Sequence, residues 1–450
     1  MAAVRRGDAQ AVTTLLEARA APDTVKDDGL PALCLAIAAY DATVARALVD
    51  GGADAGQPLP DGTTPLIRAI DGGSPAVVAS VLGREPRLRL PEAEREHLLA
   101  LARHWYQRGA EDELRSRTGR SGPVHRAQVM DTDYHHVTQL TLGGHTVRAG
   151  HGAILTDLEW AFRILTPVDA LISRAVAQHD PDHVDWRSAR WVLSERRSQE
   201  TWSAVTVFRH DPDPERRRFV LDVLFAYLVW SSSRRNSYEE ETAELLVAWI
   251  SDGEDDPGVL AEVLWVLSET DYQELRVVGL LYRSHPDPRV RARVPDLLRG
   301  WATPHPPLVA TARTALLVLA GDEDWGVRVQ AGAVLVSEND GSSAFTEAVV
   351  GLLRDPVAEV RSGIAQAVAD GAACPAAVAD ALLDLLDEED FLTRLNAAYG
   401  LLRRDDPRTG DAIERLGALS RPGFEDDHRL SALWSWKWNR DHPSAADPAT

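Results

Sequence analysis

The sequence predicts an all-α fold, an α-solenoid of stacked helical repeats, and three observations lead to it. Within residues 1–85, a shift of 33 residues superposes one segment on another. Later in the chain, an acidic turn followed by an arginine and an apolar run recurs many times. Residues 122–160 follow neither pattern. Units of this size cannot bury their apolar faces alone, so they are expected to stack on their neighbours.

The N-terminal repeat is visible in three segments. "DGLPALCLAIAAYDATVARALVDGGADA" begins at Asp28, "DGTTPLIRAIDGGSPAVVASVL" begins at Asp61, and "AAVRRGDAQAVTTLLEARAAPD" fits the same shift of 33. Thr64 and Pro65 supply a hydroxyl cap and a proline at the first helical position. These segments resemble ankyrin repeats, which implies a hairpin tip followed by two short antiparallel helices. A degenerate fourth pair is expected in "PEAEREHLLALARHWYQRGAEDELRSR".

The second pattern is marked by regularly spaced arginines. It includes "HPDPRVRARVPDLL", "GDEDWGVRVQAGAVLV", "LRDPVAEVRSGIAQAVA" and "LDEEDFLTRLNAAYGLL". Arg328, Arg361 and Arg394 are 33 residues apart. Arg291 precedes Arg328 by 37 residues, and Arg217 precedes Arg291 by 74. The spacing indicates about eight units, counting weaker copies.

Aspartates four residues before several of these arginines are expected to cap the following helices. They are Asp213, Asp287, Asp324 and Asp390. The units resemble HEAT repeats of the short bacterial kind, also called phycobilisome-lyase-type. This resemblance implies a hydrogen-bonded ladder of arginine and aspartate between successive units. Its arginines are Arg217, Arg291, Arg328, Arg361 and Arg394, and its aspartates are Asp287, Asp324 and Asp390. Val357 stands in place of an aspartate and Leu260 in place of an arginine, so the ladder is expected to be interrupted at those two units.

The repeats suggest a division of the chain into four parts. Residues 1–120 are expected to form the ankyrin stack, and residues 161–440 the HEAT-like superhelix. Residues 121–160 form a non-repeating connector, and residues 441–450, "DHPSAADPAT", are expected to be a disordered tail. The predicted architecture is therefore a short ankyrin stack followed by a longer HEAT stack.

The connector has a different composition from the repeats. "HHVTQLTLGGHTVRAG" is β-branched and contains Gly143 and Gly144, so a short hairpin or an extended connector is expected, with strands confined to residues 130–150. Imidazoles and carboxylates, which are metal-ligand types, gather here: His125, His135, His136, His145, His151, Asp131, Asp133 and Asp157. Because no H-E-x-x-H motif is present, an interdomain connector is favoured, and a metal or catalytic site is the alternative.

Charge and cysteine content limit the class of function. The net charge of −21 divides into −2 for residues 1–120, −8 for residues 121–300 and −11 for residues 301–450, which opposes binding to phosphate backbones. Cys34 and Cys374 are the only two cysteines and lie in no C-x-x-C pair, which fits a reducing compartment. No apolar run is long enough to span a bilayer. We expect a cytoplasmic protein that binds neither nucleic acid nor membrane.

Both resemblances imply a non-catalytic protein–protein interaction scaffold or adaptor. No phosphate-binding loop and no nucleophile elbow is present, and no cofactor is expected. The alternative is an enzyme on a HEAT scaffold, with DNA glycosylases and bilin lyases as precedents. A bound coloured tetrapyrrole or retained nucleic acid would distinguish that alternative.

Acidic residues are the first candidates for contact with a protein partner. Asp380, Asp384 and Asp387 are spaced to share one face of a helix that is expected to line the inner surface. This face is either ordinary solvated surface or an electrostatic seat for a basic segment of the partner. The ankyrin hairpin tips at Asp28 and Asp61 are the next candidates.

The sequence "WSWKW" in the last unit is the other candidate surface. Trp434 and Trp438 are one helical turn apart and are expected to pack inward, with Trp436 displaced to the other side. The simpler interpretation is a capping helix. The alternative is an exposed aromatic hot spot for a partner at Trp436.

Overall fold

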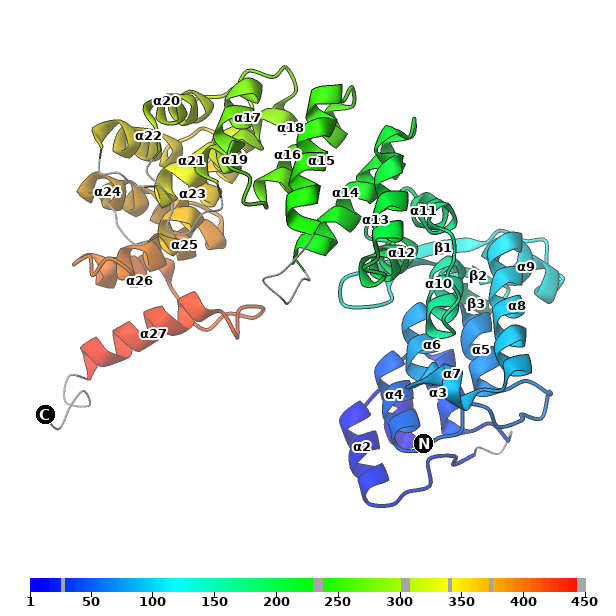
Figure 1. The fold of residues 1–450 in the computed structure, drawn as a ribbon. Helices are drawn as coiled ribbons and strands as arrows, with labels where there is room; N and C mark the ends of the chain where they lie inside the picture. Colours follow the sequence, from blue (N-terminus) through cyan, green and yellow to red (C-terminus); the bar gives the residue numbers. More distant parts are fainter. Residues whose placement is uncertain (26–28, 230–237, 301–307, 339–341, 372–374, 443–450) are drawn as a thin grey trace, which may run out of the picture. The chain divides into compact units, whose positions relative to one another are not determined.

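The computed structural model describes residues 1–25, 29–229, 238–300, 308–338, 342–371 and 375–442 (Figure 1). The chain divides into two compact units, Met1–Trp230 and Ser231–Thr450. Both units consist of helices that pack in consecutive pairs, and the strands of the described residues form one small sheet. The predicted all-α fold class is therefore confirmed. No helix in the described ranges is long and apolar enough to cross a membrane.

The first unit opens with paired helices whose caps recur at the predicted period. Asp8, Asp41 and Ser74 are spaced by 33 residues, and each side chain accepts a hydrogen bond from a backbone N–H in the first turn of its helix. Local capping thus sets the start of each second helix. The helices of this region are α1 (Ala2–Arg5), α2 (Ala9–Glu17), α3 (Ala32–Ala38), α4 (Ala42–Asp50), α5 (Pro65–Gly72), α6 (Pro75–Leu82), α7 (Pro86–Arg89), α8 (Glu92–Arg108) and α9 (Ala110–Thr118).

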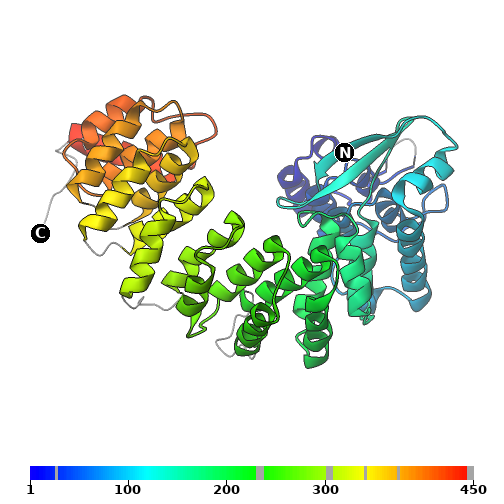
Figure 2. The same cartoon turned by 90° about the horizontal axis from the view of Figure 1, so that it is seen from above.

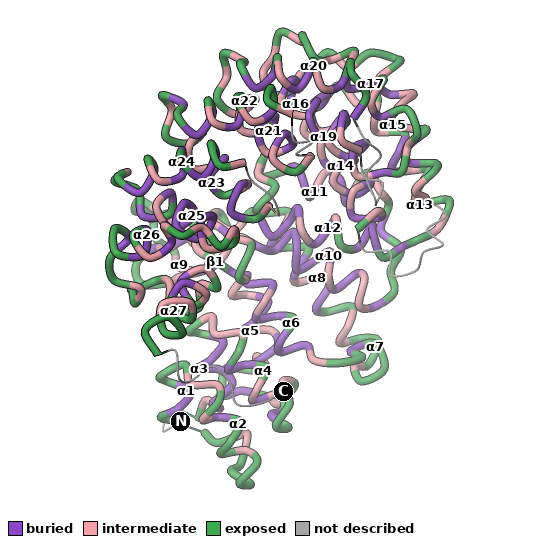
Figure 3. Tube along the Cα trace, turned by 90° about the vertical axis from the view of Figure 1, so that its left-hand side faces the viewer, coloured by how far each residue is buried: buried purple, intermediate pink, exposed green. Residues whose placement is uncertain are grey.

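Helices α1 to α6 and α8 stack in register and share one core. α2, α4 and α6 pack on one another in order, as do α1, α3, α5 and α8. Thr64 caps α5 and Pro65 occupies its first position, as predicted. The expected fourth pair is present as α8 and α9. Buried positions recur where each helix meets its neighbours, whereas the turn around α7 is largely exposed (Figure 3).

A three-stranded antiparallel sheet follows α9. Its strands are β1 (His125–Met130), β2 (His136–Leu142) and β3 (His145–Arg148), in the order β1-β2-β3. Gly143 and Gly144 both have positive φ and form the tight turn between β2 and β3, as two-residue hairpins require. β1 begins at His125, earlier than the predicted strand limits of 130–150. Its half-exposed edge position explains why the sequence gives it no strong apolar alternation.

The sheet is joined to the ankyrin helices by a buried carboxylate. Asp131 accepts hydrogen bonds from the hydroxyl of Ser74, from the backbone N–H of Ala76 and from Arg148 Nη1. Gly73, at φ 74°, lies so close to the carbonyl oxygen of Arg148 that a Cβ would be 1.8 Å from it. The sheet is seen as a cyan layer within the first unit (Figure 2). The sheet therefore packs against the ankyrin helices as part of the first unit.

Further helices complete the first unit behind the sheet. α10 packs on α6 and α8, and α12 packs on α10, α11 and α14. The change of repeat type expected near residue 160 falls inside α10, within the first unit, and stays a prediction. The helices are α10 (His151–Ala161), α11 (Val168–Val176), α12 (Val184–Glu195), α13 (Gln199–Thr206), the 3-10 helix η1 (Val207–His210) and α14 (Pro214–Val229).

The second unit is a two-row array of helices. The inner row follows α16, α19, α21, α23, α25 and α27, and the outer row follows α15, α17, α20, α22, α24 and α26 (Figure 1). A core cluster runs from Val294 to Leu433 between the rows. The helices are α15 (Tyr238–Asp252), α16 (Pro257–Ser268), α17 (Leu275–Tyr282), α18 (Pro288–Arg291), α19 (Val294–Arg299), α20 (Ala310–Leu319), α21 (Trp325–Ser337), α22 (Ser343–Leu353), α23 (Ala358–Asp370), α24 (Ala376–Asp384), the 3-10 helix η2 (Leu385–Asp387), α25 (Phe391–Leu402), α26 (Thr409–Leu416) and α27 (His428–Asp441).

Two predictions concern residues beyond the described ranges. The predicted tail begins within α27, which ends at Asp441, and residues 443–450 lie outside the described residues. Of the two cysteines, Cys34 is a buried thiol. Cys374 lies outside the described residues.

Candidate interaction surfaces

Three arginines of the second unit, on α18, α21 and α23, connect successive units of the array. The guanidinium of Arg328 forms two hydrogen bonds with the carboxylate of Asp355, Nε to Oδ2 at 2.8 Å and Nη2 to Oδ1 at 2.9 Å. The same bidentate geometry joins Arg291 to Asp322 and Arg361 to Glu388. Each carboxylate lies in the turn that precedes the next inner-row helix. The arginines thus form a ladder along the second unit.

The same arginines also hold their own turns together. Nη1 of Arg328 donates to the carbonyl oxygen of Asp322 at 2.9 Å, and Nη1 of Arg361 donates to that of Asp355 at 2.7 Å. The side chains of Arg328 and Asp355 are only 12% and 8% exposed. Burial acts to raise the pKa of Asp355, but the hydrogen bonds from Arg328 hold the pKa below its ordinary value. The Arg328–Asp355 pair is therefore mostly buried, and its charged groups are held by hydrogen bonds within the structure.

The acceptors of the ladder are not the aspartates expected from the sequence. Asp287, Asp324 and Asp390 instead accept hydrogen bonds from N–H groups in the first turns of their own helices. Val357 therefore replaces a helix cap, and α23 begins without a side-chain cap. The ladder passes through this unit, so the interruption expected at Val357 is wrong. Capping needs a side chain at the helix start, whereas the ladder uses a carboxylate two residues earlier.

Arg394 and Arg217 also hold the turns of their own units. Nη1 of Arg394 donates to the carbonyl oxygen of Glu388 at 3.1 Å, but its Nε has no hydrogen-bond partner among the described residues. Nη1 of Arg217 donates to the carbonyl oxygen of Asp211 at 2.7 Å, and Asp213 caps the following helix by accepting from Glu215 N–H. Leu260 is buried in α16 and supplies no guanidinium.

The predicted acidic stripe lies on the outer row. Asp380 and Asp384 are in α24 and Asp387 ends η2, so the expectation that they line the inner surface is wrong (Figure 1). Each carboxylate already forms an ion pair with an arginine of another helix or helix end. The pairs are Arg408–Asp380 at 2.5 Å, Arg354–Asp384 at 2.9 Å and Arg415–Asp387 at 2.6 Å. The arginines partly neutralise the stripe.

Of the two candidate residues at the ankyrin hairpin tips, Asp61 lies within the described residues. Asp61 accepts hydrogen bonds from the backbone N–H and the hydroxyl of Thr63 and pairs with Arg68 at 2.7 Å. The hydrogen bonds from Thr63 lower the pKa of Asp61 to about 2. The carboxylate of Asp61 therefore stabilises the turn at the hairpin tip and is also exposed to solvent. Asp28 lies outside the described residues.

The tryptophans of α27 are arranged opposite to the prediction. Trp434 and Trp438 are 53% and 46% exposed and stack on each other with ring centroids 5.4 Å apart. Trp436 is the one that faces inward, packing against the core cluster and lying under Arg440. The expectation that Trp434 and Trp438 pack inward is therefore wrong. The exposed aromatic surface is the Trp434–Trp438 pair.

The His-rich segment is distributed through the first unit rather than gathered at one point. His151 is buried, stacks on Trp105 with ring centroids 4.5 Å apart and bonds to the carbonyl oxygen of Ile70, and burial lowers its pKa to about 3. His136 lies 3.1 Å from a carboxylate oxygen of Asp180. His125, His145 and Asp133 are exposed. In the described part of the chain, no three His, Cys, Asp or Glu side chains group to hold a metal ion.

A buried carboxyl group, Asp185, and a partly buried one, Asp157, lie between α10 and α12. Asp185 accepts the backbone N–H of Ala153 at 2.6 Å, and Asp157 accepts the hydroxyl of Ser188 at 3.3 Å. Burial raises the pKa of Asp185 to about 7 and that of Asp157 to about 6. Asp185 caps α10 and Asp157 joins α10 to α12. The polar sequence around Asp185, "HDPDHVDWRS", gave no sign of its burial.

Comparison with protein families identifies the N-terminal repeats. Residues 1–89 match the family model described as ankyrin repeats in three copies. This range agrees with the helix pairs α1–α2, α3–α4 and α5–α6. Residues 1–89 are therefore ankyrin repeats. A comparison with curated proteins found no match.

Several solved structures are similar to parts of the chain. YibA of E. coli is 16% identical, with 59% of this chain and 90% of that chain covered and a TM-score of 0.40. An engineered protein is 15% identical, with 88% and 95% covered and a TM-score of 0.35. Human deoxyhypusine hydroxylase in complex with glycerol is 17% identical, with 65% and 99% covered and a TM-score of 0.25.

Proposed function

We propose that this chain is a non-catalytic protein-interaction scaffold in which HEAT-type repeats over residues 161–440 follow the ankyrin repeats. The ladder supports this proposal, because Arg291, Arg328 and Arg361 use the same atoms to join successive units. Repeats connected in this way carry their stability in contacts between neighbouring units. The outward-facing side chains of every unit then remain available to a partner.

The proposed partner is another protein, met in the cytoplasm and without a cofactor. A net charge of −21, with −11 in residues 301–450, repels nucleic-acid backbones and anionic membrane surfaces. Ankyrin repeats are in general protein-binding modules, which supports the same class of partner for residues 1–89.

The observation that carries the proposal is the exposed stack of Trp434 and Trp438 on α27. Large aromatic side chains dominate binding energy at protein interfaces, since they bury much surface at a small entropic cost. His442 stacks on Trp438, and the two adjacent tryptophans, each about half exposed, leave an apolar surface on α27. A partner protein would bury it.

Affinity capture from native lysate, with chemical cross-linking and mass spectrometry, tests the proposal. The parent chain is expected to retain a specific protein that the variant Trp434→Ala/Trp438→Ala loses. Trp325→Ala is the matched control, because Trp325 is 50% exposed on α21, away from this stack. Equal capture by all three proteins would place binding elsewhere. Copurification of a coloured tetrapyrrole or of nucleic acid would instead support an enzyme on this scaffold.

A further inference from the structure

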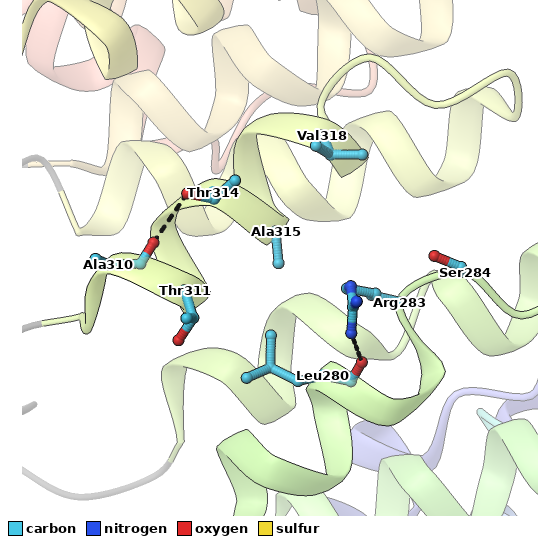
Figure 4. Close-up of a pocket in the computed structure, with 8 residues that line it drawn as sticks. All are labelled: Leu280, Arg283, Ser284, Ala310, Thr311, Thr314, Ala315 and Val318. Atoms are coloured by element: carbon cyan, nitrogen blue, oxygen red, sulfur yellow. Dashed lines mark hydrogen bonds between the residues drawn. The ribbon is translucent and has the colours of Figure 1, made fainter.

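A groove lies between the outer-row helices α17 and α20 of the second unit. It has a volume of about 450 Å³. Side chains from α17 and the turn after it face side chains of α20 across the opening (Figure 4). The residues that define it are Leu280, Arg283, Thr311, Thr314, Ala315 and Val318.

Both helices of the groove carry exposed apolar side chains. On α17, Val277 is 55% exposed and Leu281 is 72% exposed. On α20, Val318 is 67% exposed, and Val309, just before its first residue, is 50% exposed. Because Val277 and Leu281 are four residues apart, they lie on the same side of α17. The groove itself is lined by apolar side chains of both helices, among them Leu280 of α17 and Ala315 and Val318 of α20.

The charge at the groove is opposite to that of the chain as a whole. Arg283 is the charged residue among those that line the groove, in a chain of net charge −21. Neither α17 nor α20 carries an acidic residue. Arg283 is exposed at the groove, and in the described residues its guanidinium bonds only to the carbonyl oxygen of Leu280. An acidic ligand would meet no carboxylate on these two helices.

A neighbouring hollow of the second unit is acidic, in contrast to the groove. It lies beside the start of α15 and is lined by Glu239, Glu240, Glu244, Asp271 and Glu274. The acidic hollow would repel an anionic segment, whereas the groove between α17 and α20 bears an arginine. Discrimination between partners commonly rests on such repulsive elements as well as attractive ones.

We propose that the groove between α17 and α20 binds an amphipathic, acidic helical segment of a partner protein. Apolar side chains of the segment would contact Leu280, Ala315 and Val318, and a carboxylate would pair with Arg283. This inference rests on the proposed scaffold function and names the chemistry of one partner. The acidic partner proposed for the groove differs from the basic partner expected at Asp380, Asp384 and Asp387, because the two surfaces carry opposite charge.

The geometry favours a helix as the bound form. The groove residues of α20 follow the spacing Thr311, Thr314, Ala315, Val318, which presents one face over about two turns. A third helix can pack its apolar ridge into the groove between two others. A segment of roughly 11 residues, about three turns, is long enough to span it.

Two designed peptides serve as probes in a fluorescence-anisotropy titration of the full chain. Both carry leucines in a helical stripe, and the other positions are glutamate in one and lysine in the other. The glutamate peptide is expected to bind at least about tenfold more tightly at low salt, with the difference shrinking as salt screens the charges. A third peptide, with the glutamate composition but a scrambled stripe, is expected to bind weakly.

Variants locate the binding on the protein. Val318→Glu places a carboxylate on the rim, and Arg283→Glu reverses the charge, so each is expected to weaken the glutamate peptide about tenfold or more. Arg283→Glu should also improve binding of the lysine peptide. Val207→Glu, at a position 69% exposed in the first unit, is the matched control and should bind like the parent. Circular dichroism checks that all variants fold alike.

The outcomes separate this inference from the proposed function. Equal affinities for Val318→Glu and Val207→Glu, or for the striped and scrambled peptides, would overturn the groove assignment. A change of mass in sedimentation on Val318→Glu, without peptide binding, would assign the groove to a second copy of the chain and overturn it as well. In either case, capture of a partner through Trp434 and Trp438 would leave the scaffold proposal standing.

Discussion

Arg328 and Asp355, 27 residues apart in the sequence, join α21 to the turn before α23 through two hydrogen bonds of 2.8 and 2.9 Å. Nη1 of Arg328 is occupied as well, by the carbonyl oxygens of Asp322 and Glu323. The guanidinium therefore connects two turns of the array at once. This connection gives the ladder a structural role that stability measurements can test.

We predict that Arg328→Ala lowers the free energy of unfolding by about 1–3 kcal/mol, because it leaves the mostly buried carboxylate of Asp355 without its donors. Urea denaturation measures the change. Arg354→Ala is the control, since its pair with Asp384 is 55% and 60% exposed and should contribute less than about 1 kcal/mol. A variant at Arg328 that unfolds like the parent but loses a captured partner would show that Arg328 is a contact residue.

The tryptophans of α27 should divide into binding and folding roles. Trp436→Ala is expected to destabilise the second unit by about 1–3 kcal/mol, because Trp436 packs against the core cluster. Trp434→Ala and Trp438→Ala should change stability by about 0.5 kcal/mol or less, since both side chains are about half exposed. Thermal melts measure the stabilities. The reverse order of effects would contradict the inward position of Trp436.

The acidic stripe remains a predicted seat for a basic partner segment. Replacing Asp380, Asp384 and Asp387 by Asn should slow association with a captured basic partner and weaken its salt dependence, because surface charge steers encounter. The competing arginines supply a second test. Arg408→Ala frees the carboxylate of Asp380 from its pair and should speed association with such a partner. Stopped-flow rates unaffected by either change would exclude the stripe.

The buried carboxyl of Asp185 should make stability depend on pH. Its pKa is raised to about 7, so the folded chain keeps this proton where the unfolded chain has lost it, and stability falls as pH rises toward and through that value. His183, whose pKa burial lowers to about 4, acts oppositely and loses stability as pH falls.

A variant isolates the carboxyl. Asp185→Asn removes the charge and leaves the effect of His183 in place, so it should stabilise the first unit more at about pH 8 than at about pH 5. Hydrogen exchange of amides in α10 and α12 reports on that unit. An equal effect at both pH values would show that Asp185 is not protonated in the folded chain at the lower pH.

Much of the fold was predictable because its signals are local. Helix starts depend on a side chain reaching an N–H group within its own first turn, so Thr64, Asp324 and Asp390 could be recognised without any knowledge of the tertiary structure. The adjacent glycines Gly143 and Gly144 likewise predicted a hairpin. They did not predict the third strand of the sheet.

The sequence by itself determined the repeat period, the helix starts and the stacking of helical units, since each depends on neighbours within a few residues or on periodicity along the chain. The tertiary structure decided which side of a helix meets the core. It turned Trp436 inward and left Trp434 and Trp438 exposed, placed Asp380 on the outer row, and brought Asp355 to Arg328. A helical stripe shows that residues share a face, but only packing against other helices settles where that face points.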